Sequence, residues 1–490
     1  MRNRHFYLGL ATIGIAVFYL LTIRSGHRWG DDFVQYLQHA ANLAANEPYA
    51  KQMYIVNPTL SIGPPAYPPV FPIMLLSILK VAGLNFVTMK LVMGLLCGVA
   101  FLSIGLAFRD ALPGRQIVPL LLLLALAPTF WTFKEAISSD VPFLIFCFLS
   151  LALIQKMVGT PGGRELYLLS LLTALVMYLA CGTRSQGLPL LPSLLIADFW
   201  KAKRVRLAPV LTCGLVVLLL FIQNRLFFTE GERLQYLTLD PNIIWSNVTH
   251  YAGSVSTYWD NGYSHSFRYV CFIVTLALAV AGYAKRVARG VGPFEVFLPL
   301  FVLPLLFWVF QQGIRYLLPI IPLYVFYILE GVRGISARVR PDARRVLQWG
   351  LMGVAFGCFV SMYTTLDLRH IEGPLDPEAQ EMLGYVESRT GPNDVFVFEK
   401  PRLLGLFAHR KAVIPTRVED PTQDGKALEF YRAIGTKYVI TADSFANDRQ
   451  YLRPFLARNA DWAREVWSNG RFQLWEVRSD WARLDTALVR

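Results

Sequence analysis

Long apolar runs, separated by short polar loops, fill the chain up to residue 366. These runs cover residues 6–23, 85–108, 116–133, 141–158, 166–183, 188–200, 207–227, 269–284, 291–310, 316–332 and 346–366. Most of them approach the roughly 20 residues that an α-helix needs to cross a bilayer. A further apolar stretch, 69–82, is short and interrupted by proline, so we expect an interfacial or re-entrant helix there. The pattern predicts a polytopic all-α membrane domain over residues 1–366, with about eleven transmembrane helices.

After residue 366 the pattern changes to that of a soluble domain. The sequence predicts strands at 394–399 and 437–441, a helix near 425–434 and a hairpin over 466–475. The hairpin turns on an Asn-Gly pair, which favours a tight two-residue turn. Strands that alternate with helices indicate a small α/β domain over residues 367–490.

The distribution of charge then predicts how the chain is oriented in the membrane. Hydrophobic residues make up 54% of the 490 residues and charged residues 17%, below the roughly 25% typical of soluble domains. The net charge of +13 comes largely from basic loops such as 201–206, 285–289 and 333–345. This is the positive-inside pattern of a plasma (inner) membrane protein, and it requires no nucleic-acid partner. It predicts a cytoplasmic N-terminus and an extracytoplasmic C-terminal domain. The segments expected outside are 24–84, which is the first outer loop, 134–140, 184–187, 228–268, 311–315 and everything after 366.

Candidate chemistry begins with two adjacent carboxylates, Asp31 and Asp32, where the chain leaves the first apolar run. An aspartate before a helix can simply cap it, but one residue suffices for that task. Tyr36 lies four residues after Asp32 and therefore on the same helical face. The pair is interpreted as the start of an active site.

Other polar groups occur in the remaining outward segments. Tyr67 lies in a proline-rich turn of the first outer loop, residues 63–72, and Lys134 and Asp140 bound the second outward loop. Arg184 and Arg315 end apolar runs on the same side. Outward-facing arginines run against the positive-inside bias, so each calls for an anionic partner.

At these residues the chain resembles the GT-C superfamily of membrane glycosyltransferases, in particular bacterial relatives of protein O-mannosyltransferases and the lipid A aminoarabinose transferases. The matching segments are 30–36, 67–72, 139–143, 183–187 and 315–319. The resemblance implies a GT-C-like membrane domain that transfers a hexosyl or pentosyl unit. The donor would be a polyprenyl-phosphate sugar, and the acceptor a hydroxyl of a glycolipid, polysaccharide or protein at the outer face.

The resemblance also assigns roles. Asp32 corresponds to the catalytic base of the first loop, although Asp31 could exchange with it, and Asp140 corresponds to the second catalytic carboxylate. The donor and its phosphate would be bound by Arg184, Arg315, Tyr316, Tyr36, Tyr67 and Lys134. A base must take the acceptor proton while cations stabilise the departing phosphate, and the implied outcome is inversion at the anomeric carbon.

The chain departs from this family at one place. The aminoarabinose transferases carry an acidic residue and a lysine before the proline pair of the first loop, where this chain has Ala66 and Tyr67. A bound metal is therefore not carried over and no cofactor is assigned, although a divalent cation stays possible. His39, His250 and His265 show no metal-ligand spacing.

Two other functions remain open. A polytopic lipid or oligosaccharide transporter, or flippase, would also be helical, but its ionisable residues would lie at mid-membrane. A non-catalytic assembly or sensor protein would act through its outer domain. In that domain, residues 399–402 follow a predicted strand and could face an acceptor, although an ordinary loop is the simpler interpretation.

Overall fold

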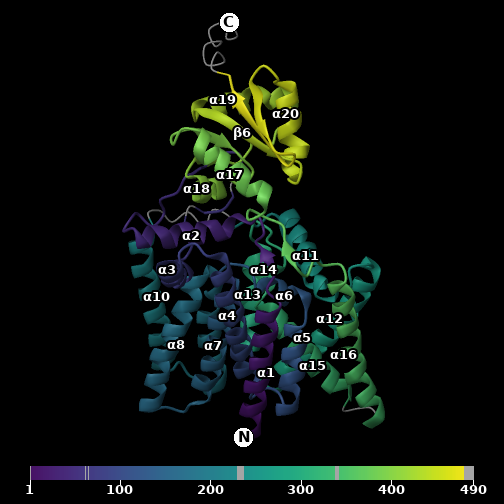
Figure 1. Ribbon diagram of the computed structural model, residues 1–490. Coiled ribbons are helices and arrows are strands. Elements are labelled where there is room, and N and C mark those ends of the chain that lie inside the picture. Colours follow the sequence, from purple (N-terminus) through teal and green to yellow (C-terminus); the bar gives the residue numbers. More distant parts are fainter. Residues whose placement is uncertain (1, 61, 65, 229–236, 337–340, 479–490) are drawn as a thin grey trace. The chain divides into compact units, whose positions relative to one another are not determined.

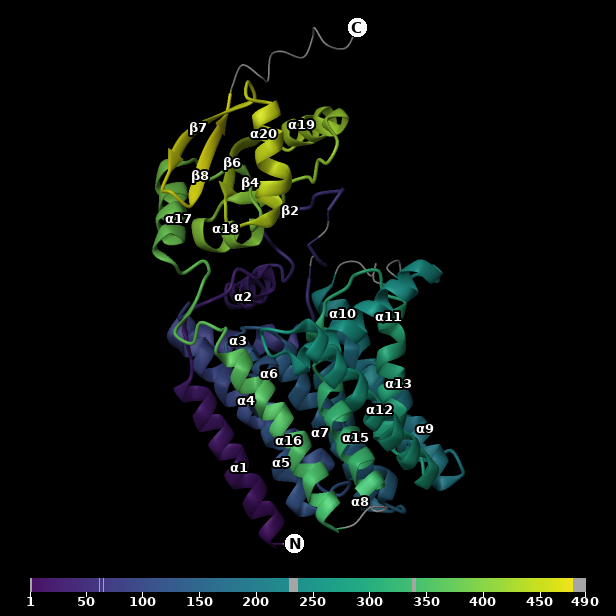
Figure 2. The ribbon, with the colours of Figure 1, turned by 90° about the vertical axis from the view of Figure 1, so that its right-hand side faces the viewer.

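The computed structural model describes residues 2–60, 62–64, 66–228, 237–336 and 341–478. The chain forms two compact units (Figures 1 and 2). The helical unit comprises residues 1–24, 68–74 and 82–369, and the sheet unit comprises 25–67, 75–81 and 370–490. Parts of the predicted outer loop 228–268, of the basic stretch 333–345 and of the predicted domain 367–490 lie outside the described residues.

The helical unit contains most of the predicted apolar runs as helices. Among the described residues, five helices are long and apolar enough to cross a membrane: α4 (Phe86–Phe108), α7 (Asp140–Gly159), α8 (Arg164–Thr183), α10 (Leu207–Phe227) and α12 (His265–Arg289). The other helices are α1 (Arg2–Leu21), α5 (Gly114–Ala125), α6 (Pro128–Phe133), α9 (Leu190–Ala202), α11 (Pro241–Ser256), α13 (Pro293–Leu306), α14 (Ile314–Leu317), α15 (Ile320–Ser336) and α16 (Pro341–Tyr363). The count of about eleven crossings stays a prediction.

One predicted run is broken. Residues 116–133 form two helices, α5 and α6, because Ala127 is extended and Pro128 begins the second helix. Proline fits the first turn of a helix, but it cannot continue one because it lacks an N–H donor. The segment 69–82, predicted to be an interfacial or re-entrant helix, forms α3 (Val70–Ala82), a helix of 13 residues.

Small residues bring two helices of this unit together. A Cβ on Gly282 of α12 would lie 2.0 Å from the Tyr327 carbonyl oxygen, and one on Gly331 of α15 would lie 2.1 Å from the Leu278 carbonyl oxygen. The two glycines therefore let α12 and α15 approach backbone to backbone, as small residues do between transmembrane helices.

The sheet unit is built on six strands in the order β2-β5-β4-β6-β8-β7. Their bounds are β2 (Tyr54–Ile55), β4 (Val395–Val397), β5 (Lys411–Val413), β6 (Thr436–Ala442), β7 (Ala463–Ser468) and β8 (Phe472–Val477). The strands from β2 to β6 in this order are parallel, whereas β8 runs antiparallel to β6 and β7. Helices α17 (Pro377–Arg389), α18 (Pro401–Ala408), α19 (Asp424–Ala433) and α20 (Arg453–Arg458) surround the sheet (Figure 2).

Part of the first outer loop folds with this sheet. Tyr54 and Ile55 form the edge strand β2 beside β5, and β1 (Ser25–Gly26) pairs in parallel with β3 (His370–Ile371). Helix α2 (Asp31–Ala44) belongs to the same unit, and it follows Trp29, whose ring contacts Phe445 at 5.2 Å between centroids. The unit therefore joins two regions that are more than three hundred residues apart in sequence.

Candidate functional site

The helical unit brings three predicted site residues into direct contact. Asp140, which is 2% exposed, accepts a hydrogen bond from Arg184 on Oδ1. Its Oδ2 accepts from Arg315 Nε and Nη2, at 3.3 and 3.1 Å. Asp140 is therefore an anionic partner of both arginines, as the sequence predicted for each of them.

Local structure places each member of this cluster. Asp140 is the first residue of α7, Arg184 follows the last residue of α8, and Arg315 lies in α14. The segment before Arg315 is held by α11, where the Asn247 amide donates to the Trp308 carbonyl at 2.8 Å and His250 Nε2 accepts from the Gly313 N–H at 3.2 Å. The supporting role of Asn247 and His250 was not predicted from the sequence.

The cluster has an excess of positive charge. Two guanidinium groups share one carboxylate, and their side chains remain 12% and 29% exposed while that of Asp140 is 1% exposed. The Arg184 guanidinium also lies 5.4 Å from the centre of the Tyr316 ring. Because guanidinium groups bind phosphate oxygens in pairs, such a group of residues can hold a phosphate.

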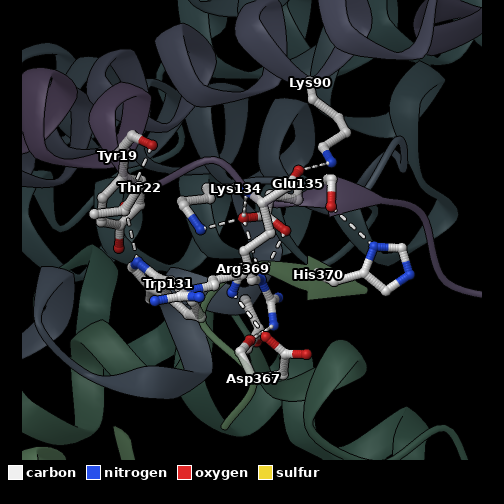
Figure 3. Close-up of polar contacts among 12 residues, drawn as sticks. Tyr19, Thr22, Lys90, Trp131, Lys134, Glu135, Asp367, Arg369 and His370 are labelled. Atoms are coloured by element: carbon white, nitrogen blue, oxygen red, sulfur yellow. Dashed lines mark hydrogen bonds and ion pairs between the residues drawn. The ribbon is translucent and has the colours of Figure 1, made fainter. Parts of the chain in front are cut away.

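Lys134 belongs to a different cluster, at the end of α1 (Figure 3). It is fully buried, contacts the Glu135 carboxylate and lies 3.5 Å from the centre of the Trp131 ring. Glu135 also binds Arg24, at 3.1 Å, and Lys90 donates to the Arg24 carbonyl. Burial lowers the pKa of Lys134 to about 8. The contacts described for Lys134 are therefore with its own segment and not with Asp140, and it is Glu135 that links this segment to the end of α1.

The sheet unit holds the carboxylate pair of the first loop. Asp31 and Asp32 open α2, but the cap is Gly30 and no side chain caps the helix. Asp32 Oδ1 accepts a hydrogen bond from the Tyr67 hydroxyl at 2.8 Å, and the Tyr36 and Tyr67 rings lie 4.9 Å apart. The two aspartates therefore do more than begin a helix.

Asp31 has an unusual acidity. Burial raises its pKa to about 6, and the neighbouring carboxylates of Asp32 and Glu399 add to this shift. Lys400 and Arg402 act in the opposite direction. Asp31 thus titrates close to neutrality, whereas the Tyr67 hydroxyl is positioned to stabilise the charged form of Asp32.

His39 orders the loop that carries Tyr67. Its Nδ1 donates to the Tyr49 carbonyl at 2.9 Å, and its Nε2 accepts from the Tyr67 N–H at 3.2 Å. Burial lowers the pKa of His39 to about 4, so the ring is neutral. Within the described residues, no group of three or more His, Cys, Asp or Glu side chains could hold a metal ion.

The segment interpreted as an ordinary loop, residues 399–402, contributes to the surroundings of the carboxylate pair. Arg402 is the second residue of α18 and is only 5% exposed, and α18 packs against α2. Local sequence could not reveal this burial, because it depends on contact with a helix that lies more than three hundred residues earlier.

Comparison with solved structures identifies the fold. Residues covering 97% of this chain superpose on 75% of an oligosaccharyltransferase AglB from Archaeoglobus fulgidus, solved with an inhibitory peptide and a dolichol-phosphate, with 12% identity and a TM-score of 0.61. Another structure of that protein, solved with Zn and sulfate, gives 11% identity and a TM-score of 0.59 over 97% of this chain and 73% of the other. ArnT from Cupriavidus metallidurans gives 12% identity and a TM-score of 0.58 over 96% and 98% of the two chains.

No protein-family model matches the sequence, and no curated protein matches it. The structural matches confirm the resemblance predicted from the motifs: the chain has the fold of GT-C membrane glycosyltransferases. Together with its apolar helices, this fold describes a multi-pass membrane protein.

Proposed function

We propose that the chain is a glycosyltransferase that moves a sugar from a polyprenyl-phosphate donor to a hydroxyl acceptor on the outer face of the plasma membrane. The observation that carries this proposal is the cluster of Asp140, Arg184 and Arg315, in which residues far apart in sequence form a cationic group. A lipid phosphate is a fitting ligand, since the AglB structure with the same fold contains dolichol-phosphate.

In this proposal Arg184 and Arg315 bind the donor phosphate. Charge accumulates on that phosphate as the glycosidic bond breaks, and preorganised cations stabilise it best when the surroundings exclude water. Asp140 holds both guanidinium groups in place, and Tyr316 supports Arg184 from one side. Lys134 would act only indirectly, through Glu135, which it contacts and which binds Arg24.

Asp32 is the proposed base. It takes the proton of the acceptor hydroxyl while the acceptor oxygen forms a bond to the anomeric carbon. The bond from that carbon to the phosphate oxygen breaks on the opposite face, and the polyprenyl phosphate leaves with the electron pair. One displacement of this kind inverts the configuration. Tyr67 keeps Asp32 oriented, and Tyr36 stacks beside it.

The direct test is transfer by the purified full chain. We expect wild-type protein in lipid nanodiscs to release polyprenyl phosphate from a labelled polyprenyl-phosphate hexose or pentose when an extract of cell-envelope acceptors is present. Asp32→Asn should abolish transfer but still bind the donor. Arg315→Gln should lose about tenfold or more in donor affinity, because charged hydrogen bonds contribute about 1.5–3 kcal/mol.

Arg268→Gln is the matched control. Arg268 also pairs with an aspartate, Asp260, at 3.3 Å in the helical unit, and its side chain is 12% exposed. Its replacement should leave donor affinity unchanged. Full transfer by Asp32→Asn, or transport of the lipid without any sugar transfer, would contradict the proposal.

A further inference from the structure

Arg402 is a buried arginine with unsatisfied hydrogen-bond donors. Its Nη2 donates to the Pro64 carbonyl at 3.4 Å, but its Nε and Nη1 are buried and have no hydrogen-bond partner among the described residues. The guanidinium lies near two tyrosine rings, 5.4 Å from the centre of Tyr54 and 5.9 Å from that of Tyr67. Because buried donors without partners are costly, two on one side chain indicate a place for a ligand.

Asp31 presents the complementary group. Its Oδ1 is buried and accepts no hydrogen bond from the described residues. Gln35 lies four residues later on the same face of α2, and its Nε2 donates to the Pro64 carbonyl at 3.0 Å. Because Arg402 donates to that same carbonyl, Asp31 and Arg402 border one small region.

Gly63 allows a close approach of side chains at this point. A Cβ on Gly63 would lie 3.1 Å from the Tyr67 hydroxyl oxygen and 3.8 Å from Arg402 Nη2. The φ angle of Gly63 is +119°, a backbone conformation that residues other than glycine rarely adopt. The hydroxyl of Tyr67 and the guanidinium of Arg402 therefore face the same glycine.

The charges near Asp31 favour a neutral ligand. Lys400 and Arg402 supply two positive charges, whereas Asp31, Asp32 and Glu399 supply up to three negative ones. An added phosphate would increase the negative excess. A sugar hydroxyl, in contrast, can donate to Asp31 and accept from Arg402 at once, and the tyrosine rings offer apolar faces to the sugar ring.

We propose that Asp31 and Arg402 form a saccharide-binding site in the sheet unit, which binds neighbouring hydroxyl groups of the acceptor. This inference rests on the proposed transferase function and narrows its acceptor to a glycan, on a glycolipid or a polysaccharide. A serine or threonine of a protein offers a single hydroxyl, whereas a glycan can place separate hydroxyls on Asp31 Oδ1 and on the two unpartnered donors of Arg402.

The test is ligand binding by the full chain in nanodiscs, free of sugar-based detergent. Saturation-transfer NMR would use methyl glycosides of common neutral hexoses and pentoses, a neutral peptide containing Ser and Thr, and inorganic phosphate as probes. We expect wild-type protein to bind at least one glycoside, and Arg402→Gln to weaken that binding about tenfold or more. Arg402→Lys should retain part of it, since lysine keeps the charge but not the planar set of donors.

Arg464→Gln is the control, because Arg464 belongs to the same unit but its side chain is 65% exposed and forms an ion pair with Glu476 at 2.9 Å. If Arg402→Gln fails to fold, Asp31→Ala replaces it and should show the same loss. The proposal is overturned if wild-type protein binds no glycoside, if folded Arg402→Gln binds as wild type does, or if Arg402 instead governs binding of the peptide or of phosphate.

The two proposals fail separately. Glycoside binding that depends on Arg402, in a chain that transfers no sugar, would keep this site and refute the transferase. Sugar transfer to peptide hydroxyls, without glycoside binding, would support the transferase and refute the saccharide-binding site.

Discussion

Asp448 is a buried carboxylate that the sequence analysis did not single out. Its Oδ2 accepts from the Ala442 N–H at 2.8 Å, whereas its Oδ1 has no partner among the described residues. Burial raises its pKa from 3.8 to about 7, and Glu399 adds to this shift while Arg453 opposes it. Asp448 therefore prefers to be protonated in the folded sheet unit.

This preference predicts that Asp448→Asn stabilises the folded sheet unit by an amount that increases with pH. Between about pH 4 and pH 7 the folded state keeps a proton that the unfolded state releases, so the stability contribution of Asp448 falls as pH rises. The variant has no such loss. We expect hydrogen-exchange protection of β6 in the variant to increase relative to wild type from about pH 5 to about pH 8. Asp461→Asn, at an exposed position, is the control. If the difference in protection between Asp448→Asn and wild type were the same at about pH 5 and about pH 8, the raised pKa of Asp448 would be contradicted.

Single residues show how far sequence reasoning reaches. Arg184, Arg315 and Asp140 could be singled out because each is out of place in a membrane protein: the arginines oppose the charge bias, and the carboxylate begins an apolar helix. Lys134 has the same local features, yet its side chain turns to Glu135. Which partner a charged side chain selects depends on packing that no local pattern records.

Helices were predicted well where one apolar face or a long apolar run dominates. Residues 141–158, 166–183 and 207–227 correspond closely to α7, α8 and α10. The run 116–133 was predicted as one helix, and Pro128 divides it. In contrast, the edge strand β2 has two residues and forms only because β5 lies beside it.

The network at the end of α1 gives a prediction for these elements. Glu135, whose side chain is 1% exposed, is shared by Arg24 and Lys134, so Glu135→Gln leaves buried cations without their counter-ion. We expect a loss of about 3–5 kcal/mol in the free energy of unfolding, the range for one missing partner of a buried pair. Thermal unfolding in detergent would measure it.

Glu165→Gln is the matched control for this change. Glu165 pairs with Lys156 at 3.6 Å, and both side chains are more than half exposed. Exposed pairs contribute about 0–1 kcal/mol, so this variant should unfold much as wild type does. Equal effects of the two substitutions would show that the network at α1 does not hold the helices together.

The molecule as a whole is organised by contacts distant in sequence. Residues 25–67 fold with residues 370–490, so the Asp31–Asp32 pair belongs to the unit that carries the sheet. Hydrophobic periodicity predicted the elements on both sides of this association but not the association itself.

The most direct measurement is a cryo-electron microscopy structure of the full chain in nanodiscs with an unreactive polyprenyl-phosphate sugar and a glycan acceptor. We expect the phosphate oxygens to be bonded to Arg184 and Arg315, and the Asp32 carboxylate to lie about 3 Å from the acceptor hydroxyl. A phosphate bound away from these arginines, or an Asp32 too distant to reach any hydroxyl at the anomeric carbon, would contradict the account.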